Sequence, residues 1–144
     1  MTRHLVAAFG SLVLLSIGAR PVLAHHSFAA EFDASKPVTL HGTITKLEWI
    51  NPHSWLHVDV KNDDGTTTEW MVEAATPNTL LRRGFTRDTV KAGTEITVIG
   101  YQAKSGAHRA NGRDLILADG SRLFMGSADT GAPGDAAKSE PAQQ

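Results

Sequence analysis

Residues 42–60 decide the fold of this 144-residue chain: Gly-Thr-Ile-Thr-Lys-Leu-Glu-Trp-Ile-Asn-Pro-His-Ser-Trp-Leu-His-Val-Asp-Val. Residues 43–50 are rich in β-branched side chains, and Pro52 then interrupts them, because proline has no N–H to give to a sheet. After the break, Leu56 and Val58 alternate with Trp55 and His57. A period of two places the two sets on opposite faces of a strand. The stretch therefore predicts two strands with one core-facing side and one polar and aromatic side.

Further strand patterns lie on both sides of this stretch. A first strand is expected from Pro37, with a change of parity after Ile44 that predicts a bulge. Strands are also expected at 66–73 and 94–102, with a short helix over 76–84 between them, a loop over 103–113 and a closing hairpin over 115–125. This order predicts an all-β fold with one short helix, a small antiparallel barrel of the oligonucleotide/oligosaccharide-binding (OB) type. A generic β-sandwich or an open meander is the alternative.

The two ends of the chain are read as separate from this domain. Arg3 precedes an apolar run, and small or apolar residues end at Ala24, a pattern typical of a secretory signal peptide over residues 1–24. Residues 126–144 have no large apolar side chain, so they are interpreted as a disordered tail. The predicted domain, an N-terminal arm and a barrel, spans residues 25–125.

Charge and motifs exclude several classes of function. Removal of residues 1–24 takes away Arg3 and Arg20 from 14 basic residues, which leaves 12 against 15 acidic ones. A nucleic-acid partner held by bulk charge is therefore not expected, and no membrane span is expected in the mature protein. There is no cysteine, Gly-x-Ser-x-Gly or His-Glu-x-x-His motif, so the chain is not expected to be an enzyme.

Several short motifs resemble a family of small exported bacterial proteins catalogued as domain of unknown function 6152. The residues that carry the resemblance are His25-His26-Ser27, Gly42, Asn51-Pro52-His53, Gly84, Lys91-Ala92-Gly93 and Gly100. It covers about residues 24–124. The resemblance implies an export signal and a small β-rich domain, and it implies no established activity.

The histidines are the best candidates for a binding site. Six of the seven remain after removal of the signal peptide, and imidazole is a common ligand of copper, zinc and nickel. The candidate metal ligands are His25, His26, His53, His57 and His108. Copper is favoured because the chain offers no thiolate and because Met71 and Met125 are soft donors. We therefore expect an exported periplasmic or secreted binding protein that holds copper through histidines.

A metal-free binding module is the alternative function. In an OB arrangement the ligand surface lies on the second and third strands and on the loops that join strands 1–2 and 4–5. This places Asn51, Trp55 and Arg109 at a surface for a small ligand, a sugar or a peptide. The sequence leaves the ligand, the oligomeric state and any redox role open.

The first testable prediction concerns the start of the mature protein. Cleavage after Ala24 yields an exported chain that begins at His25. Intact-mass analysis of untagged periplasmic protein measures this directly. A mass that still includes residues 1–24 contradicts the prediction.

Overall fold

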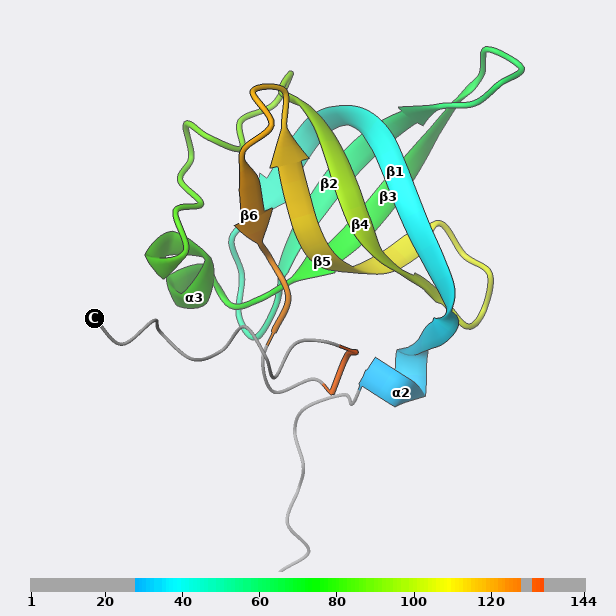
Figure 1. Ribbon diagram of the computed structural model, residues 1–144, viewed down its shortest axis with the longest axis horizontal. Coiled ribbons are helices and arrows are strands. Elements are labelled where there is room, and N and C mark those ends of the chain that lie inside the picture. Colours follow the sequence, from blue (N-terminus) through cyan, green and yellow to red (C-terminus); the bar gives the residue numbers. More distant parts are fainter. Residues whose placement is uncertain (1–27, 128–130, 134–144) are drawn as a thin grey trace, which may run out of the picture.

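The computed structural model describes residues 28–127 and 131–133 (Figure 1). Its elements, in chain order, are α2 (Phe28–Glu31), β1 (Phe32–Glu48), β2 (Ser54–Lys61), β3 (Thr67–Ala74), α3 (Pro77–Arg82), β4 (Glu95–Ala103), β5 (Arg109–Leu117) and β6 (Arg122–Phe124). Among the described residues, no helix is long and apolar enough to cross a membrane.

Five strands close into a ring. The sheet order is β3-β2-β1-β4-β5-β6, and an additional pairing joins β3 to β5. That pairing is parallel and short, from Met71 and Arg109 to Glu73 and Asn111, while all the other strand pairs are antiparallel. Figure 1 shows the strands coiling around a common interior, with β6 beside β5. The predicted all-β fold of OB-like strand order is confirmed.

The long strand β1 pairs with two neighbouring strands, and it bends where one pairing gives way to the other. β1 pairs with β4 through residues 32–43 and with β2 through residues 42–48, with a register shift between Ile44 and Lys46. This is the predicted bulge. Gly42 lies where both neighbours pair with β1, and a Cβ there would stand 2.3 Å from the Asp59 carbonyl oxygen. Only glycine allows so close an approach of the two strands.

The α3 helix has the ends that the sequence predicts. The Thr76 hydroxyl accepts a hydrogen bond from the Thr79 N–H, and Pro77 occupies the first turn. Gly84 has a φ of +89° just after the helix, a backbone conformation that L side chains rarely adopt. Leu80 is the buried residue through which this short helix packs on the barrel.

The alternation predicted for β2 is also confirmed. Leu56 and Val58 are 1% and 0% exposed, whereas Trp55 and His57 are only half-buried on the other face. The inward residues of all five ring strands meet in one cluster, which Leu80, Phe85, Val90 and Met125 complete.

A second, smaller cluster joins the two ends of the described chain. The Phe28 ring packs edge-on against Tyr101, with ring centroids 5.4 Å apart, and Phe32 stacks beside it. Ala132 is buried in the same cluster. The segment beyond Met125 therefore adds one apolar side chain to the packing, which its composition did not suggest.

Two element boundaries differ from the sequence prediction. β1 begins at Phe32 rather than at Pro37, and β5 begins at Arg109, so the predicted loop over 103–113 is wrong in extent. For β5 the reason is its partner strands, because residues 109–111 pair with β3 on one side and residues 110 and 111 also pair with β4 on the other. Backbone pairing on two sides makes a strand from residues of low β-propensity.

Val58→Asp tests the core face of the hairpin. It places an unpaired carboxylate at a fully buried site, so we expect loss of a large part of the ~5–15 kcal/mol that holds a domain of this size folded. Thr67→Asp is the matched control, because Thr67 is exposed and lies opposite Lys61. Urea unfolding of both variants measures the difference. Equal destabilisation contradicts the assigned faces.

Candidate functional site

Strand register places a set of polar side chains on the outer surface of β2, β3 and β5. One row across these strands consists of Trp55, Glu73 and Asn111, and the next row consists of His57, Met71 and Arg109. We call these six residues, together with Glu69 of β3, the polar face. Core residues such as Leu56 and Val72 lie between them in the strands, so their side chains point away from the barrel interior, although Glu73 and Asn111 are themselves largely covered.

His53 lies at the end of the β1–β2 loop and contacts this face. Its Nδ1 atom is hydrogen-bonded to Oε1 of Glu73, which lies beside Trp55 on the neighbouring strand. The two side chains are only 13% and 7% exposed. A carboxylate that accepts from Nδ1–H fixes the tautomer and the orientation of the ring. The other ring nitrogen, Nε2, has no partner among the described residues.

Glu73 is a carboxylate held largely out of water. Burial raises the pKa of Glu73 above its ordinary value, because the ionised form loses hydration. The nearby imidazole of His53 opposes this rise, and Glu31 of α2 adds to it. The pKa of Glu73 therefore depends on His53 and on Glu31 of α2.

His57 is held differently from His53. Its Nδ1 atom lies 3.1 Å from Oε1 of Glu69, and its Nε2 atom lies 3.3 Å from Oε1 of Glu48. The ring thus bridges β1 and β3 with a carboxylate at each nitrogen. The Nε2 atom of His57 is buried and makes no hydrogen bond within the described part of the chain, so it is not presented to solvent as a free ligand.

The structure does not bring His53, His57 and His108 together. The His108 ring lies 5.2 Å from the Trp70 ring, and Trp70 is four residues along β3 from Ala74, which pairs with the residue after His53. Four residues of a strand span about 13 Å. Among residues 28–127 and 131–133, no group of three or more histidine, aspartate or glutamate side chains could hold a metal ion.

The other predicted site residues fall into three groups. His25 and His26 lie outside the described residues. Asn51 is exposed in the loop before β2, next to the cis peptide bond with Pro52. Met125 is 1% exposed in the barrel core, so its sulfur is not accessible to a surface ion, whereas Met71 belongs to the polar face.

Trp55 and Arg109 meet, as the OB arrangement predicts. The Arg109 guanidinium carbon lies 4.8 Å from the centre of the Trp55 ring, and one of its nitrogens lies 3.9 Å from Oε2 of Glu31. A cation over an indole face is attracted by the ring quadrupole. The short helix α2 therefore borders the polar face through Glu31.

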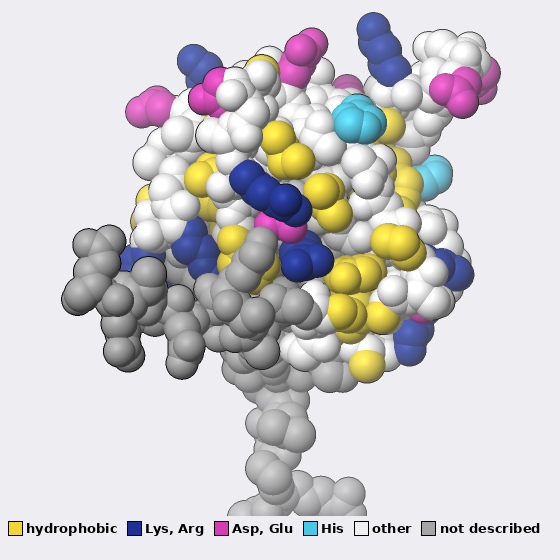
Figure 2. Space-filling model, in the orientation of Figure 1, with side chains coloured by type: hydrophobic (Ala, Val, Ile, Leu, Met, Phe, Trp, Pro, Cys, Tyr) yellow, Lys and Arg dark blue, Asp and Glu magenta, His cyan; other side chains and the backbone are white. Residues whose placement is uncertain are grey.

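A separate groove lies elsewhere on the barrel. It has a volume of about 560 Å³ and contains none of the predicted site residues; His41, Asp59, Lys61, Thr67 and Glu95 are among the residues that line it. The histidine side chains visible in Figure 2 appear as separate patches and not as one cluster. The groove and the polar face are therefore distinct surfaces.

Sequence reasoning missed Glu73, Glu31 and Asn111. Alternation gave a usable signal for Glu73, because it shares the parity of Glu69 opposite the inward Val72. No local signal existed for Glu31 or Asn111. They reach the polar face only through the packing of α2 and the parallel β3–β5 pairing.

The chain was compared with sequence families, curated proteins and solved structures. Residues 13–112 match the family described as "Family of unknown function (DUF6152)". No curated protein and no solved structure gives a significant match.

The raised pKa of Glu73 gives a pH-dependent prediction. Its folded-state pKa lies above the ordinary 4.5, so its contribution to stability is present below that pH and is lost as the pH rises through the folded-state value. The Glu73→Gln side chain cannot ionise, so the variant does not lose this stability as the pH rises. The thermal midpoint of the metal-free variant, relative to wild type, should therefore rise as the pH is increased above 4.5.

The matched control is Glu69→Gln, on the same strand and with a side chain that is 57% exposed. A Glu73→Gln difference that stays constant over the same pH range contradicts the assignment.

Proposed function

We propose that this chain, which belongs to the DUF6152 family, is an exported periplasmic protein that binds copper through His53 and the histidine at its mature start. The observation that carries the proposal is the contact between His53 Nδ1 and Glu73. Metal-binding histidines almost always give their second ring nitrogen to a carboxylate, a carbonyl or a water. His53 is arranged in this way, with Nε2 left for an ion.

His53 is preferred over the other histidines because of what each ring nitrogen contacts. Both nitrogens of His57 face carboxylates, and the His108 ring lies against Trp70. His41 is hydrogen-bonded through Nδ1 to the Thr97 hydroxyl, at the groove rather than at the polar face. Among the histidines that the structure describes, only His53 combines a buried carboxylate partner with a second nitrogen that contacts no described residue.

The N-terminus of the mature protein would supply the other nitrogen ligands of the copper ion. With cleavage after Ala24, the α-amino group and Nδ1 of His25 can chelate one ion. The amine has a pKa of about 7.7–8.0, so Cu(II) can displace its proton at neutral pH. Together with Nε2 of His53 this makes a three-nitrogen set, which suits Cu(II).

The position of α2 supports this pairing. His25 precedes Phe28 by three residues, a span of about 10 Å at most. In the same helix, Glu31 lies beside Arg109, whose guanidinium covers Trp55, the cross-strand neighbour of Glu73. The helix α2 therefore borders the polar face that His53 contacts.

The test is titration of the untagged, exported protein with Cu(II), followed by calorimetry and electron paramagnetic resonance. We expect one tight site in the native protein. An additional N-terminal glycine or His53→Ala should each weaken it by on the order of 100-fold, and Glu73→Gln by about 10–100-fold. His41→Ala is the matched control and should bind as the native protein does.

Two outcomes contradict the proposal in different ways. If the additional glycine leaves the affinity unchanged, the amine is not a ligand and the proposed site is wrong. If only His53→Ala has no effect, the amine binds copper with a different partner.

A further inference from the structure

The guanidinium of Arg109 has few contacts with the described residues. Its nearest carboxylate, Glu31, is 3.9 Å away, beyond hydrogen-bonding distance, and its other described contact is the Trp55 ring at 4.8 Å. No hydrogen bond of this guanidinium is found among the described residues. A guanidinium group carries five N–H donors. The Arg109 side chain is 38% exposed, so water can reach these donors.

The groups around Arg109 all favour a positive charge. Glu31 comes from α2, Glu73 from β3 and the Trp55 ring from β2. The fourth group is Asn111, two residues along β5 on the same face; it is 3% exposed, and its Oδ1 atom has no hydrogen-bond partner in the described part of the chain. Arg109 therefore lies against one carboxylate and an aromatic ring, while a second carboxylate and an unpaired amide oxygen occupy neighbouring register positions of the same face.

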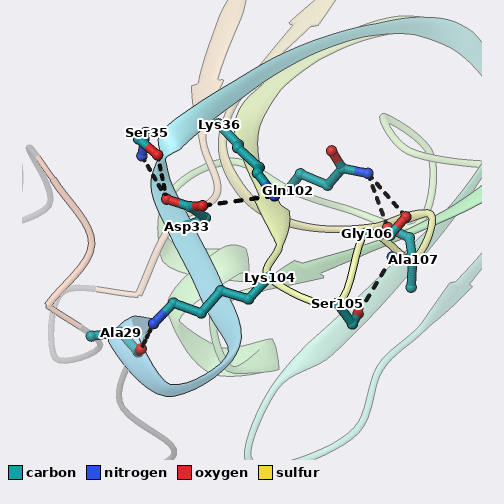
Figure 3. Close-up of polar contacts among 9 residues, drawn as sticks. All are labelled: Ala29, Asp33, Ser35, Lys36, Gln102, Lys104, Ser105, Gly106 and Ala107. Atoms are coloured by element: carbon teal, nitrogen blue, oxygen red, sulfur yellow. Dashed lines mark hydrogen bonds and ion pairs between the residues drawn. The ribbon is translucent and has the colours of Figure 1, made fainter.

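The position of Glu31, the carboxylate beside Arg109, does not depend on Arg109. Lys104 binds α2 twice, through its backbone N–H to the Glu31 carbonyl and through its ammonium group to the Ala29 carbonyl (Figure 3). Phe28 adds the ring contact with Tyr101. Glu31 is thus held at the edge of the polar face by its helix, and Arg109 can leave without releasing it.

We propose that the polar face binds an organic cation, a guanidinium or ammonium group, and that Arg109 occupies the place of this group in the free protein. The ligand cation would stack on Trp55 and pair with Glu31, and Asn111 Oδ1 offers an acceptor beside them. Binding requires only that Arg109 swings from Trp55 into solvent. This inference involves neither copper nor the chain before Phe28.

The experiment uses the full mature protein, kept metal-free with a chelator. The probe is N-acetyl-arginine amide, and its uncharged isostere N-acetyl-citrulline amide is the ligand control. Binding is measured by the NMR shift of the Trp55 indole N–H, which Trp55→Phe assigns. Arg109→Ala removes the internal competitor and should bind the arginine probe about fivefold more tightly than wild type, as the loss of one exposed cation–π contact implies.

Two further variants make the result decisive. Glu31→Gln, added to Arg109→Ala, should abolish the gain, whereas Arg87→Ala, which removes an exposed arginine outside this face, should bind as wild type does. A lysine probe and an arginine-containing tripeptide then distinguish an ammonium from a guanidinium and a free cation from a peptide.

The proposal fails if Arg109→Ala binds no more tightly than wild type, or if the citrulline probe binds as well as the arginine probe. Circular dichroism confirms that each variant is folded before titration. Since the protein is free of metal throughout, failure here leaves the copper proposal standing, and failure of the copper titration leaves this one standing.

Discussion

The parallel pairing of β3 with β5 is the contact on which the arrangement of the binding surface depends. It joins only Met71–Glu73 to Arg109–Asn111, yet it closes five strands into a ring. Without it, β5 would be bound to β4 and β6 alone, and Arg109 would have no fixed relation to Trp55. With it, residues from β2, β3 and β5 stand in two rows on one outer surface. The same few hydrogen bonds close the core and assemble the polar face.

Much of this fold could be predicted from local sequence. Alternation gave the faces of β2, Pro77 and Gly84 bounded α3, and the parity change after Ile44 gave the bulge, because each is a short-range consequence of backbone sterics or side-chain period. The start of β5 could not be predicted in this way. Residues 109–113, Arg-Ala-Asn-Gly-Arg, have weak β-propensity and become a strand because β4 and the more distant β3 pair with them.

The residues of the candidate site also differ in whether the sequence alone predicts them. Asn51, Trp55 and Arg109 were expected on one surface from strand order alone, and Trp55 and Arg109 do meet. Their chemistry, however, is set by Glu73, Glu31 and the carboxylates at His57, which are brought in by cross-strand neighbours and by α2. Two histidines of one hairpin thereby acquire different roles. His57 spans two carboxylates as a bridge between strands, and His53 keeps one nitrogen unshared.

The two proposed ligands are both cations, and Glu73 lies between their sites. It contacts His53 directly, and it shares a row with Trp55, over which Arg109 lies. An ion at His53 and an organic cation on Trp55 would each be attracted by this carboxylate and would repel one another across it. Because coupling between two binding sites is reciprocal, each ligand would weaken the other by the same factor. A bound organic cation would displace Arg109, whose charge already lies over Trp55, so this factor reflects only the difference between the two cations in their distance from the metal site.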